Sequence, residues 1–355
     1  MSAVKTWGLN VCLLFISGGL SVLLLEGLVR IMFPVYNPSG MVAFYHNETG
    51  VLIGKKNSVT HQWMKAGDFN VEIRINQYGF RDTKDLQRST ASDFFVVGDS
   101  FSFGHGVAEA KRYSNLLEAW LGIPVYNISI PTDFDGYEKL IKYAQANGAT
   151  IKNLIIGVCM ENDLENYAIA SSADPGKTVQ RETEASSYYN KINMGTFFRV
   201  KVFLGKTFAI YNVVISLFHQ NPMLKALAGK FGIMDRYPDG INRTVYSEEI
   251  LKKSSARLRQ LQSNCQIPTI TLVIIPSRAL WIGEHRAIEL KVHQDFVRLL
   301  RNQGFNVIDL RPAFEEGGEP LQYHFENDGH WNEKGHLKAA EIIFVYLRAT
   351  RQNSH

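Results

Sequence analysis

The sequence contains few cysteines: Cys12, Cys159 and Cys265 are the three in 355 residues. No two of them form a Cys-x-x-Cys pair, so the sequence predicts neither a disulfide framework nor a cysteine-based metal site. It also lacks a long basic run, and its formal net charge is only +4. Because binding to a phosphate backbone requires clustered Lys and Arg, nucleic acid is not an expected partner.

Several catalytic and cofactor-binding motifs are missing as well. Gly205-Lys206-Thr207 resembles the end of a phosphate loop, but Val200 stands where its first glycine should be. Gly104-His105-Gly106 has no third glycine at the dinucleotide-binding spacing. No His-Glu-x-x-His motif occurs, and no Gly-x-Ser-x-Gly turn surrounds Ser100. The sequence therefore predicts no cofactor and no metal.

The amino-terminal residues 1–33 form the clearest apolar segment. Val11–Leu25 is almost wholly apolar, Glu26 interrupts it, and the apolar pattern then resumes around Arg30. This length reaches a bilayer span only if the turn that bears Glu26 lies near an interface, and no Ala-x-Ala-like cleavage site is present. We predict an uncleaved, single-pass anchor in the cytoplasmic membrane, with a removed signal peptide as the alternative. Lys5 before the segment favours an inside amino terminus and a periplasmic or otherwise extracytoplasmic globular part.

Residues 34–92 are polar and rich in predicted strands. Residues 69–76 alternate apolar and polar side chains, which is typical of a half-exposed strand. Arg81 and Asp82 follow a turn, and we expect them to brace a loop rather than to border a functional site.

Residues 93–355 alternate strands with amphipathic helices. We predict strands over 93–99, 125–130, 153–160, 269–276 and 306–310. Helices are predicted over 108–121, 135–147, 248–263, 287–303 and 333–349. Continuous apolar strands that alternate with helices favour a doubly wound α/β domain with a parallel sheet covered on both faces.

Residues 164–246 interrupt this alternation and are predicted to be a helical insertion. Its apolar pattern over 197–218 is typical of one or two helices. These helices could be a packing element, a lid or a membrane-surface element, and the sequence leaves the three open.

Polar residues follow three of the predicted strands. Ser100 comes directly after the first, Asn162-Asp163 after the third, and Asp328-Gly329-His330 lies on the loop before the last helix. A serine nucleophile needs a histidine base, and the base needs a carboxylate on its other nitrogen. An Asn amide can donate to a developing oxyanion. The carboxyl ends of parallel strands meet at one edge of the sheet, so these residues form one candidate site.

With these motifs the chain resembles the SGNH (GDSL-like) hydrolase family, over residues 93–349. The resemblance implies a flavodoxin-like sandwich with a five-stranded sheet and ester chemistry. It also implies that Ser100 is the nucleophile and contributes its backbone N–H to the oxyanion hole, that Asn162 is an oxyanion donor, and that His330 is the base. Asp99 and Asp163 are expected to support these loops.

Two departures from the family pattern concern the base and the oxyanion hole. Most members place the Asp three residues before the His, where this chain has Asn327; Asp328 is two before, as in alginate-acetylating relatives with an Asp-x-His-Trp pattern. The family's oxyanion glycine has no clear counterpart. Thr132 stands at the expected place and Gly136 is the nearest glycine, and the sequence does not choose between them. Asp328, His330 and His336 could be drawn as metal ligands. However, His336 comes six residues after His330 and is expected in the last helix, turned away from the other two, so no metal site is predicted here.

The sequence thus predicts a membrane-anchored serine esterase or O-acyltransferase that uses Ser100, His330 and Asp328. The resemblance implies a carbohydrate or other acyl-ester substrate, with O-acetyl groups of an envelope polysaccharide favoured, and envelope polysaccharide machinery as a partner. Two alternatives stay open. One is a non-catalytic glycan-binding or scaffold protein, and the other is a lipase-like esterase that acts on membrane lipids.

Overall fold

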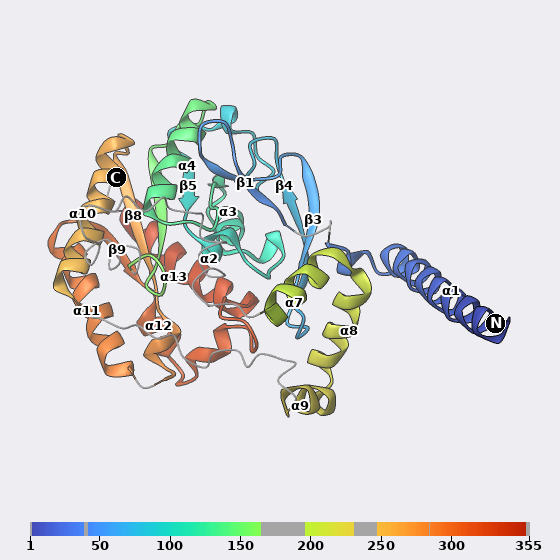
Figure 1. Ribbon diagram of the computed structural model, residues 1–355. Helices are drawn as coiled ribbons and strands as arrows, with labels where there is room; N and C mark the ends of the chain where they lie inside the picture. The colour runs from blue at the N-terminus through green and yellow to red at the C-terminus, as the bar shows by residue number, and fades with distance from the viewer. Residues whose placement is uncertain (1, 39–41, 165–195, 231–246, 284, 353–355) are drawn as a thin grey trace, which may run out of the picture. The chain divides into compact units, whose positions relative to one another are not determined.

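The computed structural model in Figure 1 describes residues 2–38, 42–164, 196–230, 247–283 and 285–352. These residues cluster into two compact units, each of which is described by itself. The first unit contains 2–38, 63–70 and 196–230. The second contains 42–62, 71–164 and the described residues from 247 to 352.

The second unit is built on a parallel sheet of five strands. Its strands are β5 (Phe94–Val97), β6 (Val125–Asn127), β7 (Asn153–Cys159), β8 (Thr269–Ile275) and β9 (Asn306–Asp309). They lie in the order β6-β5-β7-β8-β9, and every neighbouring pair is parallel. This is the flavodoxin-like order, in which the chain winds away from β5 in both directions. The predicted doubly wound α/β fold is therefore confirmed.

The strands are apolar on both sides because both faces of the sheet are covered. Phe95 and Val97 of β5 belong to one apolar cluster, whereas Phe94 and Val96 belong to the other. This alternation follows from the two-residue period of a strand. One face packs against α4 (Phe134–Ala146), α10 (Glu248–Asn264) and α11 (Arg286–Asn302). The other packs against α3 (Tyr113–Leu121), α12 (Arg311–Glu315) and α13 (Glu333–Gln352).

The predicted strands and helices of this domain are all present, with ends that differ by a few residues. The largest difference is at α3, since residues 109–111 form a separate turn of 3-10 helix before it. Before the sheet lie two antiparallel pairs of strands. They are β1 (Phe44–His46) with β2 (Leu52–Gly54), and β3 (Ser58–Trp63) with β4 (Asn70–Ile75). The expected strand at 69–76 corresponds to β4.

Arg81 and Asp82 brace loops, as expected. The buried Arg81 guanidinium donates to the carbonyl oxygens of Phe103, Gly104 and Val107 at 3.2, 2.6 and 2.7 Å. The Asp82 carboxylate accepts the backbone N–H of Asn127 at 2.7 Å. These contacts hold the chain just after α2 (Ser100–Phe103) and at the end of β6.

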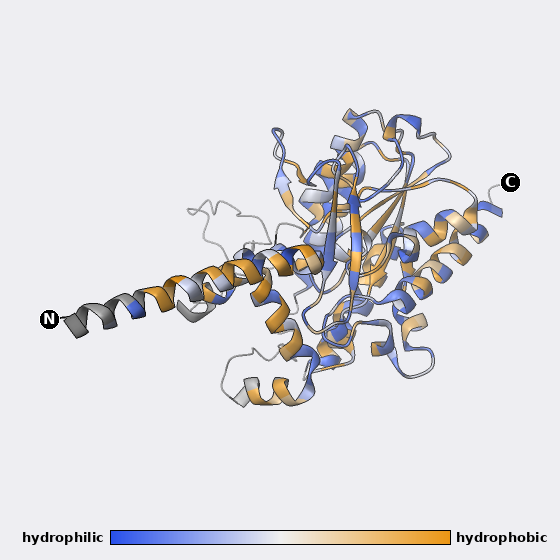
Figure 2. Ribbon diagram, turned by 90° about the vertical axis from the view of Figure 1, so that its right-hand side faces the viewer, coloured by the Kyte–Doolittle hydropathy of each residue, from blue (hydrophilic) through white to orange (hydrophobic). Residues whose placement is uncertain are grey.

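The first unit is helical. Its elements are α1 (Ser2–Met32), a 3-10 turn η1 (Pro34–Tyr36), α7 (Thr196–Thr207), α8 (Ala209–Gln220) and α9 (Pro222–Lys230). Figure 2 shows how apolar α1 is along most of its length. Its residues Leu13–Met32 are long and apolar enough to cross a membrane, as an anchor or a signal sequence would be. The predicted insertion contains α7 and α8, and also α9, which was not predicted; 165–195 and 231–246 lie outside the described residues.

One test of this packing concerns His336, which is buried in α13 and accepts the Tyr113 N–H at 3.4 Å. Burial, with the nearby cations of Arg112 and Arg81, lowers the pKa of His336 to about 3. The unfolded chain takes up this proton near pH 6.5, so the stability given by the neutral ring is complete above pH 6.5 and is lost as the pH falls toward 3.

We predict that His336→Gln destabilises the protein less at pH 5 than at pH 7.5, by about 2 kcal/mol. Urea unfolding of the full chain in detergent at the two pH values measures this difference. His285→Gln, at an exposed position, is the matched control. An equal cost of His336→Gln at both pH values would contradict a neutral, buried ring.

Candidate active site

The candidate site lies where the strand order of the sheet reverses. β6 lies on one side of β5 and β7 on the other, so the loops after β5 and β7 separate from each other at this edge. Open α/β sheets bind their ligands at such a switch point. Ser100 begins α2 directly after β5, and Asn162 follows β7.

Ser100, His330 and Asp328 form a continuous hydrogen-bonded chain. The Ser100 hydroxyl lies 2.7 Å from His330 Nε2, and His330 Nδ1 lies 2.5 Å from Asp328 Oδ1. Because a carboxylate only accepts, Nδ1 carries the ring proton and Nε2 is left to accept the serine proton. Asp328 Oδ1 also accepts the backbone N–H of His330 at 2.9 Å. This local turn sets the carboxylate beside the ring of the residue two positions later.

The loop that presents Ser100 is held by close packing. A side chain at Gly98 would place its Cβ 2.3 Å from Ser102 Oγ, and one at Gly157 would place it 2.2 Å from the same oxygen. Ser102 is fully buried there and accepts a hydrogen bond from the Tyr113 hydroxyl at 2.8 Å. The chain therefore needs glycine at both positions, so that α2 can start immediately beside the sheet.

Asp99 and Asp163 support the two loops from inside. Asp99 caps α2 by accepting the N–H of Phe101 at 3.0 Å, and its other oxygen accepts the Asn162 amide at 3.2 Å. Asp163 accepts the Cys159 N–H at 2.9 Å and the Tyr137 hydroxyl at 3.1 Å. Burial raises the pKa of both carboxyl groups, and for Asp163 the charge of Asp99 raises it further. These contacts fit the supporting roles expected for them.

The Asn162 amide lies beside Asp99, the residue before Ser100, whereas the Gly136 N–H already has a hydrogen-bond partner in another loop. An Asn amide has two N–H donors, and the hydrogen bond to Asp99 uses one of them. The Gly136 N–H donates to Asp133 Oδ1 at 2.9 Å in the cap of α4, and the Thr132 side chain lies over Gly136. The structure therefore does not offer the Gly136 N–H as a third oxyanion donor.

His105 is a site residue that the sequence analysis missed. Its ring stacks on His330 with ring centres 4.0 Å apart, and its Nε2 lies 3.6 Å from Asp328 Oδ2. Gln62 of β3 fixes its proton. The Gln62 oxygen accepts the Gly106 N–H at 2.8 Å, so the Gln62 nitrogen faces His105 Nδ1, also at 2.8 Å. An amide nitrogen only donates, so the neutral His105 ring carries its proton on Nε2, toward Asp328.

The two histidines keep Asp328 ionised. Burial by itself raises the pKa of Asp328, but its contacts with His105 and His330, both of which are protonated at the acid pH where this carboxyl group would titrate, lower it far below its usual range. Burial, and the charge of His330, also lower the pKa of His105. A carboxylate and a neutral His105 are thus the forms that the site holds at neutral pH.

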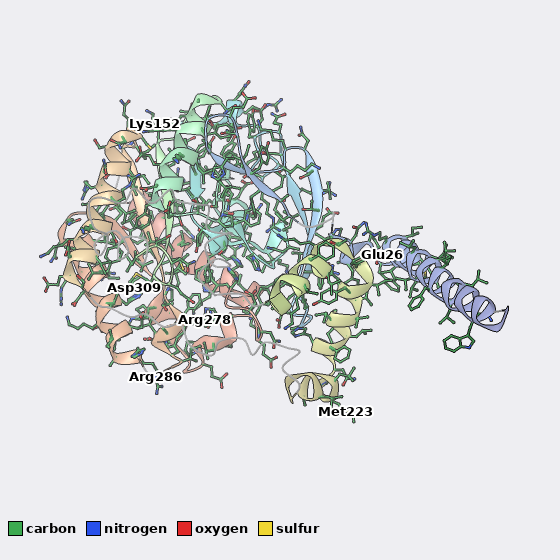
Figure 3. The ribbon with its side chains drawn as sticks, in the orientation of Figure 1. Glu26, Lys152, Met223, Arg278, Arg286 and Asp309 are labelled. Atoms are coloured by element: carbon green, nitrogen blue, oxygen red, sulfur yellow. The ribbon has the colours of Figure 1, made fainter. Side chains whose placement is uncertain are left out.

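Arg278, labelled in Figure 3, adds a cation to the same loops. A side chain at Gly329 would place its Cβ 2.3 Å from the Arg278 guanidinium, so this group lies against the backbone between Asp328 and His330. Arg278 also donates to Glu161 Oε1 at 3.1 Å. The pair therefore connects the loops that follow β7 and β8 with the histidine loop.

Among the described residues, His105, Asp328 and His330 are a group whose ligand atoms lie within 4.8 Å of one another, as a metal site requires. However, the two imidazole planes are only 21° apart. Their lone pairs lie in the ring planes, and two stacked planes at this small angle, with ring centres 4.0 Å apart, do not meet close to both rings, whereas a metal needs lone pairs that converge on one point. This geometry suits hydrogen bonding better than metal binding.

The chain is similar to solved structures of lipolytic and carbohydrate-active proteins. One is a member of the lipolytic G-D-S-L family from Veillonella parvula, at 9% identity and a TM-score of 0.40, over 70% of this chain and 94% of that one. Another is a lipase/acylhydrolase from Enterococcus faecalis, at 14% identity and a TM-score of 0.35, over 72% and 96%.

A third similar structure is a carbohydrate esterase of family 2, with its carbohydrate-binding domain, from Corynascus thermopiles. It is 12% identical, with a TM-score of 0.36, over 76% of this chain and 68% of that one. No family model matches the sequence, and no curated protein matches it.

The contact between His105 and Asp328 leads to a test with two variants of similar size. His105→Leu removes the N–H donor, so we expect kcat to fall roughly tenfold, the value of one weak hydrogen bond to a charged group, with little change in KM. His105→Gln restores a donor and is expected to recover part of the loss. Steady-state hydrolysis of an activated ester measures both. Equal losses in the two variants would mean that His105 only fills space.

Proposed function

We propose that the protein is a serine esterase or O-acyltransferase whose catalytic residues are Ser100, His330 and Asp328. The observation that supports this most strongly is the continuous hydrogen-bonded chain from Ser100 Oγ through the His330 ring to Asp328. The geometry fits these roles, since Asp328 accepts from His330 Nδ1 and leaves Nε2 facing the Ser100 hydroxyl.

In the proposed reaction, His330 Nε2 takes the hydroxyl proton while Ser100 Oγ attacks an ester carbonyl carbon. The negative charge that develops on the carbonyl oxygen is stabilised by the Ser100 backbone N–H and by the second N–H of the Asn162 amide. His330 then gives its proton to the departing alcohol, and an acyl-serine remains. Asp328 stays ionised and stabilises the imidazolium throughout.

The acyl-enzyme is then attacked by a hydroxyl group that His330 deprotonates. If water attacks, the product is a carboxylic acid and the protein is an esterase. If a sugar hydroxyl attacks, the acyl group is transferred. We infer that the acyl group is acetyl and that the carrier is a glycan of the cell envelope, because an anchor over residues 1–33 would hold the enzyme beside such polymers. This part rests on the resemblance to polysaccharide-modifying proteins.

Two other functions compete with this one. A glycan-binding or scaffold protein of an envelope assembly would not need the Ser100–His330 contact. A lipase-like enzyme would use the apolar helices α7–α9 at the lipid surface, and it would cleave long acyl chains better than acetyl groups.

The proposal predicts that Ser100→Ala and His330→Ala each lower the turnover of an acetyl ester by roughly 10⁴-fold, because either change removes the nucleophile–base pair. Turnover of acetyl and octanoyl esters by the full chain in detergent measures this. Ser92→Ala and His285→Ala, at exposed positions, are the matched controls.

The outcome also separates the alternatives. A chain that turns over neither ester, and whose rate does not depend on Ser100, would favour the binding or scaffold function. A clear preference for octanoyl over acetyl would favour the lipase-like function.

A further inference from the structure

In the first unit, a charged pair in α1 is attached to the turn between α7 and α8. Glu26 is only 7% exposed, although it lies in an otherwise apolar helix, and its carboxylate accepts the Arg30 guanidinium at 2.7 Å. The same carboxylate accepts the first two N–H groups of α8, from Ala209 and Ile210, at 2.8 and 2.9 Å. Arg30 also donates to the Thr207 carbonyl at the end of α7, at 2.6 Å.

These contacts fix the position along the α1 axis at which α8 begins. Helix ends leave backbone groups unpaired, and here the side chains of another helix satisfy them. Glu26 lies six residues before the end of α1 at Met32, which is about 9 Å along the helix axis. Because Leu13–Met32 is the candidate span and is about as long as the hydrocarbon core is thick, the α7–α8 turn lies about 9 Å inside the end of that span. This is within the roughly 5–10 Å to which helices on a membrane surface bury their apolar side.

The polarity of α8 is the reverse of that of a water-facing helix. Its buried side includes Asn212 and Ser216, which are 4% and 1% exposed. Asn212 donates to the Tyr36 carbonyl at 3.0 Å, and Ser216 donates to the Lys65 carbonyl at 3.3 Å. Its outer side includes Val214 and Leu217, which are 42% and 58% exposed. A helix of a soluble domain normally buries such apolar residues and exposes the polar ones.

The neighbouring helices also expose apolar side chains. Val200 and Phe203 of α7 are exposed, and so are Met223 and Leu227 of α9. Spacings of three and four residues place each pair on one side of its helix. Met223 and Glu26 are both labelled in Figure 3.

The charge of this segment is also unusual. Residues 196–230 contain five Lys and Arg residues and no Asp or Glu. Since the whole chain has a net charge of +4, the remaining residues together have a charge of −1. Helices that lie on membranes with anionic lipids typically combine an apolar side with basic residues and contain few acidic ones.

We propose that α7, α8 and α9 lie on the surface of the bilayer that α1 spans, with their exposed apolar side chains among the lipid acyl chains and their basic residues near the phosphates of anionic phospholipids. The partner is thus the membrane itself. This inference depends on α1 as an anchor and does not depend on ester chemistry.

The test uses the full chain in vesicles of phosphatidylcholine and phosphatidylglycerol, with nitroxide labels at Leu217→Cys or Met223→Cys. Cys12→Ser provides the background, because Cys159 and Cys265 are buried. Spin relaxation by oxygen, which partitions into lipid, is compared with relaxation by a water-soluble nickel chelate. Leu24→Cys in α1 is the lipid reference, and the exposed Val345→Cys in α13 is the aqueous reference.

We expect the labels at 217 and 223 to resemble the Leu24 label, with oxygen more effective than nickel, and to shift toward the aqueous reference in vesicles without phosphatidylglycerol. Labels that resemble Val345 while Leu24 is in lipid would overturn the proposal. Labels that neither reagent reaches would overturn it too, in favour of a second copy or another protein on this surface.

Discussion

The hydrogen bond between Ser100 Oγ and His330 Nε2 joins two loops that are 230 residues apart in the chain. It requires each loop to be placed to within a few tenths of an ångström. The first loop must start a helix immediately after β5, and the second must bring a histidine over the end of that strand. Most of the polar contacts around the site can be understood as the means by which the fold meets this requirement.

The supporting groups are buried and mostly bind backbone. Arg81 donates to three carbonyl groups at the end of α2 and just after it, and Asp99 caps the start of the same helix. A buried guanidinium or carboxylate is costly unless it is paired, so these groups favour a single arrangement of the loop. On the other side, Gln62 sets the tautomer of His105, and His105 faces the Asp328 oxygen opposite the one that His330 uses. The candidate base is thus oriented from both directions.

Much of the fold follows from the sequence. Short continuous apolar segments alternate with longer amphipathic helical segments, and this order is typical of a parallel sheet covered by helices on both faces. Ser100 and Asn162 could be placed for the same reason, since both directly follow such strands. Asp328 was predicted against the commoner family spacing, which falls on Asn327; the reason it can reach the ring is a local turn in which Asp328 accepts the His330 N–H, and spacing alone does not show this turn.

Other features depend on contacts that spacing does not reveal. Gly136 was one of two candidate oxyanion donors, with Thr132, from its place after β6, but the sequence does not show that Asp133 accepts the Gly136 N–H. His105 follows Ser100 by only five residues, and its role depends on Gln62 from a distant strand. Glu26 looked like an interruption of a membrane span, whereas it accepts the first N–H groups of α8. Such long-range pairings are decided by tertiary structure and not by local pattern.

The central claim is that His330 activates Ser100 as a nucleophile. The most direct measurement is labelling of the full chain with a fluorophosphonate, followed by mass spectrometry of the modified peptide. The account predicts modification of Ser100, and loss of labelling in His330→Ala but not in the control His285→Ala. A folded protein that stays unlabelled, or one that is labelled at another serine, would contradict it.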